Sequence, residues 1–329
     1  VQIDSIHGRF SSPSVIHRDY KIYQNYAYAV CDEGMSSLQI FDLSYLPDSA
    51  VVAAEFVDEF TRVHNLFIDE ENQLMYACSI NESSGGVLLG AQPMQVYSLA
   101  DPLNPALLYT GPIDIPTVHD AFVKNNIAYL NCGYDGIRVY DFSDPANPVY
   151  LQNMNIYQDQ GYNHQGWLTP DGKTYIFGDE TEGRKIKKCA VEADHTLTIS
   201  NSFGTNSTDG TVAHNMMCSN EFAFVAYYTE GLRIYDLRYS VPREVAHYDT
   251  HPDLNSFSMY GAWGVYSNLP SGRIIVSDRN YGLFLFDFRE DVFVNQTNEV
   301  VSIYPNPISS GDNLTIRLEE RDVSQFEIK

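Results

Sequence analysis

The segment GIRVYDFSDPANP at residues 136–148 decides the fold, because variants of it recur along the whole chain. Its first half alternates apolar and polar residues, which is the period of a β-strand, and its second half is an Asp-Pro turn. The other copies are SLQIFDLS (37–44), MQVYSLADPLNP (94–105), GLRIYDLRYSVP (231–242), GLFLFDF (282–288) and a weaker one, GRKIKKCAVEAD (183–194). Six copies predict a repeat architecture.

Each copy stands at the same place in a longer repeat of strand-like runs. A run such as IAYLNCG (127–133) precedes it across a Gly-containing turn, a further run lies upstream, and a fourth follows the Asp-Pro turn. Four antiparallel strands per repeat are typical of β-propeller blades. We therefore predict an all-β fold, a six-bladed β-propeller, as a single domain over residues 1–295. An open β-sandwich or two separate β-domains is the alternative.

The last repeat ends at residue 288 without a fourth strand-like run. The N-terminal segment VQIDSIHG (1–8) has no strands before it, so we expect it to complete the sixth blade and close the ring. Residues 296–329 break the repeat. We expect a linker followed by the truncated start of a β-sandwich, with a short β tail.

The composition of the chain limits the functions and partners to be expected. Lys and Arg number 20 against 43 Asp and Glu, a net charge of −23. A protein that binds nucleic acid by neutralising phosphates carries the opposite sign, so no nucleic-acid partner is expected. No apolar run approaches the length of a membrane-spanning helix, so no membrane span is expected.

Two parts of the chain resemble known families. The copies IRVYDFSDPANP and LQIFDLS, with GAWGVYSNLPSGRIIVSDRNYGLFLFDF (261–288), resemble the LVIVD-repeat proteins, including those called choice-of-anchor B. The tail VVSIYPNPISSGDNLTIRL (300–318) resembles the start of the C-terminal sorting domain of type IX secretion in Bacteroidota. These resemblances imply a secreted or surface-anchored extracellular protein whose partner is the type IX secretion machinery. The Lys-rich copy at 183–194 departs from the LVIVD pattern.

Five of the nine histidines occupy one repeat position, in the first strand of each blade. They are His17, His64, His119, His164 and His214. First strands line the channel of a propeller, so inward-facing imidazoles would converge and could bind zinc, copper or iron. The best subset is His119, His164 and His214, from consecutive blades. Alternatively, the shared histidine makes a repeated hydrogen bond to the backbone of the neighbouring blade.

Polar and small residues recur in register as well. Residues that directly follow a histidine could orient its ring, namely Asn65, Asp120, Gln165 and Asn215. Acidic turns at 32–33, 135 and 179–182 could hold calcium. Repeated aspartates such as Asp141 are expected to cap the Asp-Pro turn. The aligned Cys31, Cys78 and Cys132 are expected in the core, which leaves Cys189 and Cys218 as a candidate disulfide pair.

No familiar catalytic motif is present in the sequence. The leading hypothesis is a binding or structural module of the cell surface, with an extracellular protein or a glycan as ligand and a metal in the channel as a further candidate. One alternative is a metal-dependent enzyme, a hydrolase or an oxidase, that uses the channel histidines. Another is a subunit of an extracellular assembly. Whether the protein is an enzyme stays open, with a non-enzymatic role favoured.

Overall fold

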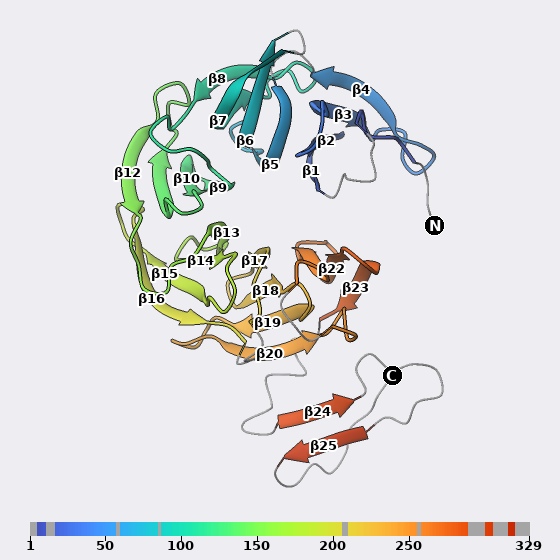
Figure 1. Cartoon of the computed structure of the whole chain (residues 1–329), viewed down its shortest axis with the longest axis vertical. Coiled ribbons are helices and arrows are strands. Elements are labelled where there is room, and N and C mark those ends of the chain that lie inside the picture. The colour runs from blue at the N-terminus through green and yellow to red at the C-terminus, as the bar shows by residue number, and fades with distance from the viewer. Residues whose placement is uncertain are drawn as a thin grey trace. The chain divides into compact units, whose positions relative to one another are not determined.

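The structure is a computed structural model that describes most of the repeat region (Figure 1). The described residues are 5–10, 17–56, 60–84, 87–205, 210–254, 258–288, 300–304 and 315–319. Every regular element in them is a β-strand. This part of the chain accordingly contains no helix long and apolar enough to span a lipid bilayer.

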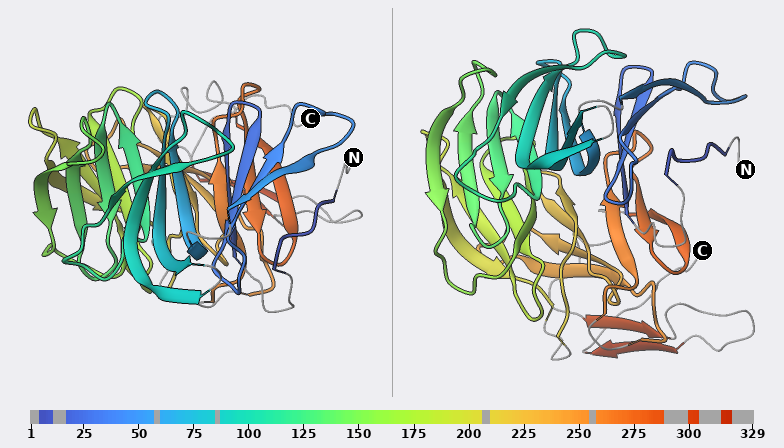
Figure 2. Two further views of the ribbon diagram at one scale, coloured as in Figure 1. Left: turned by 90° about the horizontal axis from the view of Figure 1, so that it is seen from above. Right: turned by 45° about the horizontal axis from the view of Figure 1, so that its top comes forward.

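The strands follow the sequence repeat, and those of each repeat lie side by side as one twisted antiparallel sheet (Figure 2). The first two sheets contain β1 (Arg18–Tyr23), β2 (Tyr26–Cys31), β3 (Leu38–Asp42) and β4 (Val51–Phe56), then β5 (Phe60–Asp69), β6 (Leu74–Ser84), β7 (Val87–Ser98) and β8 (Ala106–Thr110). The next two contain β9 (Asp120–Lys124), β10 (Ile127–Asn131), β11 (Ile137–Asp141) and β12 (Val149–Met154), then β13 (Asn163–Leu168), β14 (Thr174–Asp179), β15 (Ile186–Val191) and β16 (Leu197–Phe203). The last two contain β17 (Met216–Cys218), β18 (Phe222–Ala226), β19 (Leu232–Asp236) and β20 (Arg243–Tyr248), then β21 (Ala262–Tyr266), β22 (Arg273–Asp278) and β23 (Gly282–Asp287). These six sheets are the blades of the predicted six-bladed β-propeller.

The sixth sheet has three strands in the described part of the chain, where the sequence predicted a fourth from the N-terminal segment. Residues 1–4 of that segment lie outside the described residues, and residues 5–8 form no strand. The residues that follow bind the first sheet instead. The Arg9 N–H donates to Gln39 Oε1 at 2.9 Å, and the Arg18 guanidinium donates to the Phe10 carbonyl at 2.7 Å.

A two-stranded sheet follows the repeats, as the tail pattern predicted. It pairs β24 (Val300–Tyr304) with β25 (Thr315–Glu319) in antiparallel register. The turn residues Pro305, Asn306 and Pro307 and the following Leu314 lie outside the described residues. The division into a propeller over 1–295 and a truncated sorting domain over 296–329 stays a prediction.

Contacts divide the chain into two compact units. One comprises Val1–Leu168, Gly172–Glu180 and Lys188–Ser200, and the other comprises Thr169–Asp171, Thr181–Lys187 and Asn201–Lys329. Within the first unit, the first strands of consecutive blades are neighbours, since β5 contacts both β1 and β9, and β9 contacts β13. Within the second unit, β21 contacts β17 and β18. Residues at the start of these strands are therefore brought together within each unit.

Tyrosines fill much of the space between blades. Most of the largest side chains that are fully buried are tyrosines, and Tyr129 of β10 stacks on Tyr175 of β14 with ring centroids 4.8 Å apart. Offset aromatic pairs of this kind add about 0.5–1.5 kcal/mol beyond the area they bury. The Tyr175 hydroxyl also donates to Asn131 Oδ1 at 3.0 Å, so the polar end of the ring is satisfied.

The repeated aspartates and cysteines have structural roles. Asp42, Asp141 and Asp236 each end a third strand and accept the backbone N–H two residues later, at 2.8, 2.8 and 2.9 Å. This confirms that they cap the turn. All five cysteines are buried, and none of them forms a disulfide bond. The core placement of the aligned three is confirmed, and the candidate disulfide between Cys189 and Cys218 is wrong.

Candidate functional site

Four of the five aligned histidines form a continuous row of imidazole rings in the first unit. His64 and His164 lie within β5 and β13, whereas His17 and His119 directly precede β1 and β9. Because these strands are neighbours, successive rings come into contact. Their centroids are 4.5 Å apart for His17 and His64, 4.2 Å for His64 and His119, and 4.2 Å for His119 and His164. The predicted convergence is confirmed for these four side chains.

The fifth histidine, His214, lies in the second unit and has other neighbours. Its ring is 4.2 Å from that of Trp263 and 4.7 Å from that of Tyr228. Its Nδ1 hydrogen-bonds to the Trp263 carbonyl. Among the described residues it belongs to neither of the two groups that could hold a metal ion. The subset of His119, His164 and His214 named from the sequence therefore stays a prediction in its third member, because His214 lies in the other unit.

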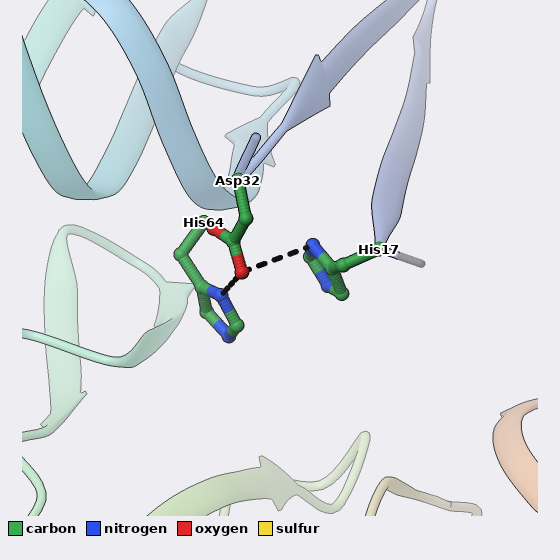
Figure 3. A group of neighbouring side chains, drawn as sticks. All are labelled: His17, Asp32 and His64. Atoms are coloured by element: carbon green, nitrogen blue, oxygen red, sulfur yellow. Dashed lines mark hydrogen bonds and ion pairs between the residues drawn. The ribbon is translucent and has the colours of Figure 1, made fainter. Parts of the chain in front are cut away.

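The first group is His17, Asp32 and His64 (Figure 3). Asp32 directly follows β2, and its Oδ2 is 2.7 Å from His64 Nδ1 and 3.6 Å from His17 Nδ1. The two imidazoles are nearly parallel, at 8°. A metal ion lies close to the plane of each imidazole that binds it, and two parallel stacked planes do not meet. The group is therefore arranged to hold a proton between a carboxylate and an imidazole rather than an ion.

Electrostatics within this group favour the proton on His64. Burial alone would raise the pKa of the Asp32 carboxyl, but the His64 hydrogen bond and the charges of His64 and His17 hold that pKa below its ordinary value. Burial opposes the charged form of His64 too, yet Asp32 raises the pKa of His64 overall. For His17, burial and then the charge on His64 lower the pKa. Asp32 and His64 thus form an oriented pair.

The second group is His119, His164 and Glu180, and its geometry suits a metal ion. The His119 Nδ1 donates to the His164 carbonyl at 2.9 Å, so the His119 lone pair lies on Nε2. The two ring planes are tilted by 43°, and His164 Nε2 lies 3.7 Å from Glu180 Oε2. The three candidate ligand atoms lie within 4.8 Å of one another. Ligands about 2.0–2.2 Å from a tetrahedral zinc are about 3.3–3.6 Å apart, so the three side chains would have to move closer together to bind the ion.

Both groups need residues that the sequence reasoning placed elsewhere. Asp32 and Glu180 fall in the acidic turns that the sequence offered to calcium, but each lies against histidines. The signal was the hairpin register. Arg18 pairs with Cys31, which places Asp32 opposite His17. Asn163 pairs with Asp179, which places Glu180 opposite Tyr162, two residues before His164. Mixed imidazole and carboxylate ligands favour a transition metal over calcium.

Tyr162 supports the second group from the loop before β13. Its ring meets the His119 ring edge-on at 5.4 Å, and its carbonyl accepts the Glu180 N–H at 2.8 Å. Gly133 makes this packing feasible, because its φ is +58° and a Cβ there would lie 2.7 Å from the Tyr162 ring. Tyr162 in turn contacts the ring of Tyr134, which is 78% exposed. The aromatic pair leads from the metal group to solvent.

Asn65 and Asp120, which follow His64 and His119, connect two neighbouring blades, whereas Gln165 bonds within its own strand. Asn65 Nδ2 donates to Asp120 Oδ2 at 2.6 Å, and Asp19 Oδ2 accepts the Leu66 N–H at 2.8 Å. Gln165 Nε2 donates to the Gly166 carbonyl at 3.2 Å. The rings are oriented by other groups: Asp32 for His64 and the next blade's backbone for His119 and His214. The alternative of a repeated hydrogen bond to the neighbouring blade is thus confirmed for two histidines.

The buried carboxyl group of Asp120 should make the stability of the folded state depend on pH. Burial, with the charge of Asp19 and against that of Lys21, raises the pKa of the Asp120 carboxyl from 3.8 to about 7. The folded state therefore binds an extra proton between these values, and stability falls as pH rises through about 7. We expect Asp120→Asn to flatten the melting temperature between pH 5 and pH 8. An equal decline in the variant and the wild type would contradict the assignment.

Comparisons with known proteins identify the fold. No family model matches the chain, and no curated protein matches it. Among solved structures, a protein from Lactobacillus plantarum covers 93% of this chain and 88% of its own, with 14% identity and a TM-score of 0.64. The chain has the β-propeller fold. A protein from Bacteroides uniformis, provisionally described as a 6-phosphogluconolactonase, gives 15% identity, 82% and 80% coverage and a TM-score of 0.61.

A further neighbour corrects the functional hypothesis. The periplasmic gluconolactonase of Pseudomonas aeruginosa gives 15% identity, coverage of 71% of this chain and 70% of its own, and a TM-score of 0.54. Identities this low establish the fold alone. Nevertheless, three similar propellers are described as lactonases, two of them provisionally. This finding overturns the binding or structural module that we inferred from the sequence, and it favours the alternative of an enzyme.

Proposed function

We propose that the protein is a metal-dependent hydrolase of cyclic esters. The observation that carries the proposal is the convergence of His119, His164 and Glu180 beside the oriented pair of His64 and Asp32. Two imidazoles and one carboxylate form a ligand set that leaves positions open for water and substrate. The lactonases among the similar propellers support a cyclic ester as the substrate class.

In the proposed reaction, His119, His164 and Glu180 would hold zinc, copper or iron, which would supply Lewis-acid activation of water. A water molecule gives up a proton, and its oxygen attacks the carbonyl carbon of the lactone. The ring C–O bond then breaks, and the leaving alkoxide takes up a proton, so one water is consumed and one hydroxy acid is formed. Zinc best fits this chemistry, because it activates water without a redox change.

His64 is placed to carry the proton. Its ring lies 4.2 Å, centroid to centroid, from that of the metal ligand His119, and Asp32 holds its Nδ1 at 2.7 Å. The Nε2 side then faces away from the carboxylate, as a proton-transferring imidazole requires. His64 therefore takes the proton from water and returns it to the alkoxide.

The test is elemental analysis and hydrolysis by the same preparation. The protein is purified without chelator and without a nickel column, and glucono-δ-lactone opening is followed by proton release at constant pH. We expect about one metal ion per chain and hydrolysis that a chelator abolishes and zinc restores. A metal-free protein, or activity indifferent to the chelator, would overturn the proposal. Oxygen consumption with the lactone left intact would instead indicate the oxidase alternative.

The family resemblance and the cellular location also belong to this proposal. The repeat copies support membership of the LVIVD-repeat or choice-of-anchor B proteins, and the tail at 300–318 supports export by the type IX machinery to the outside of the cell. An extracellular protein or glycan at the cell surface, and calcium in exposed acidic turns, remain candidates as further partners. Expression in a Bacteroidota host with and without residues 296–329 tests the address, and equal export of both forms would contradict it.

A further inference from the structure

The second unit contains a groove whose charge is opposite to that of the whole chain. One hollow of about 250 Å³ is lined by Arg184, Lys185, Thr205 and Thr211, among others. An adjoining hollow of about 680 Å³ shares Lys185, Gly204 and Thr205 with it. Because three lining residues are common to both, the hollows form one groove, which we call the basic groove. All of its lining residues belong to the second unit.

The basic groove concentrates positive charge. Among the residues that the structure describes, its lining includes Arg184, Lys185, Arg233 and Arg243, with Glu244 as the one carboxylate. The chain as a whole has more than twice as many acidic as basic residues, 43 against 20. A reversal of this kind in an acidic protein keeps a local positive potential that attracts anions.

The narrow end of the basic groove is the hollow of about 250 Å³, and its lining suits a polar ligand. The Gly183 N–H donates to the Thr211 carbonyl at 3.1 Å, which joins the two walls. The backbone of Thr205 hydrogen-bonds to the hydroxyl of Tyr227, which is only 1% exposed. A Cβ at Gly204 would lie 2.8 Å from that hydroxyl, so a side chain there would crowd the floor of the hollow.

The wider end of the basic groove is the hollow of about 680 Å³, and its lining combines charged and apolar side chains. The Arg233 guanidinium is bound by Glu244 at 2.8 Å and also by Glu230, so its charge is largely balanced. Arg243 lies over the Tyr239 ring, 4.1 Å from its centroid, and Val241 is 51% exposed. A volume of about 680 Å³ is within the range of small-molecule sites, about 300–1,000 Å³.

We propose that the basic groove binds a small molecule that carries a phosphate or sulfate group. The oxyanion sits at the narrow end, against Arg184, Lys185 and the threonine hydroxyls. The rest of the ligand extends toward Val241 and Arg243. Guanidinium, ammonium and hydroxyl groups are the donors that tetrahedral oxyanions take. The basic groove shares no residue with the group of His119, His164 and Glu180, so its test does not depend on hydrolysis.

Calorimetric titration of the whole chain with inorganic phosphate in a chloride buffer tests the narrow end. We expect saturable binding that Lys185→Gln weakens by about tenfold, the effect of one charge-assisted hydrogen bond. Gly204→Ala should weaken it as well, by crowding the Tyr227 hydroxyl. The matched control is Arg273→Gln, which removes one exposed positive charge on β22 outside the groove lining and should leave binding unchanged.

Two further titrations distinguish the ligand class. Inorganic sulfate should compete with phosphate, because the site recognises a tetrahedral oxyanion. A hexose monophosphate should bind more tightly than inorganic phosphate, since it also occupies the wider end. No phosphate binding, or equal losses in Lys185→Gln and Arg273→Gln, would overturn the site. A hexose monophosphate that binds no better than phosphate would overturn the role of the wider end.

Discussion

The variant His164→Ala is expected to lose its bound metal and to hydrolyse lactones about a thousandfold more slowly than the wild type. The imidazole is 3% exposed and is one of the three candidate ligands, so its removal leaves two protein ligands for the ion. A metal ion supplies several kcal/mol of transition-state stabilisation, and a thousandfold loss corresponds to about 4 kcal/mol. Elemental analysis and initial rates on one preparation measure both effects.

His164→Ala should disturb the rest of the site little, because it keeps the backbone contact that orients His119. The His119 Nδ1 is held by the carbonyl of residue 164, which alanine retains, so His119 should keep its orientation. The companion variant Glu180→Gln preserves shape and removes only the negative charge. The control is His195→Ala, an exposed histidine outside the repeat position. Metal retained at wild-type stoichiometry in both His164→Ala and Glu180→Gln would refute the assignment of the ligands.

The second large effect concerns stability. Gly231, in the turn between β18 and β19, has a φ of +74°, and a Cβ there would fall on the Tyr248 carbonyl oxygen at the end of β20. Alanine in this conformation costs about 1 kcal/mol on its own. The clash with backbone adds to that cost, because the fourth strand cannot move without breaking its ladder. We expect Gly231→Ala to destabilise the protein by about 3 kcal/mol or more in chemical denaturation.

Gly282 provides the matched control for this prediction. It occupies the corresponding place in the sixth sheet with a φ of +88°, and a Cβ there would meet nothing within 4 Å. Gly282→Ala should therefore cost only the conformational part, about 1 kcal/mol. Equal destabilisation by the two variants would show that the fourth strand plays no part. Gly136, which faces the Met154 carbonyl in the third sheet, should behave like Gly231.

The sequence predicted the blades well, because strand alternation and turn residues are local properties that repeat. Segments such as 136–148 became β11 with its Asp141 cap as expected. The closing strand depends on a pairing between opposite ends of the chain; it stays a prediction for residues 1–4, which lie outside the described residues, and residues 5–8 form no strand. Where the structure describes it, the N-terminal segment binds the first sheet through Arg9 instead.

The sequence predicted only part of the candidate site. Shared repeat position was enough to bring four histidines together, since equivalent strands are neighbours. The shared repeat position did not identify Asp32 and Glu180. These two residues differ in type, and only the hairpin register indicates that each lies near a histidine. The shared repeat position also led to the grouping of His214 with His119. It did not indicate that His214 hydrogen-bonds to the carbonyl of Trp263 in the next blade.

The three-stranded sixth sheet has a consequence for how the molecule opens. In the described part of the chain, β23 is hydrogen-bonded to β22 alone, and its Leu283 and Leu285 are 69% and 56% exposed. Its outward amides should exchange with deuterium faster than those of β19, which is paired on both sides. An engineered strand added along β23 would complete the ladder, cover both leucines and raise the free energy of this local opening.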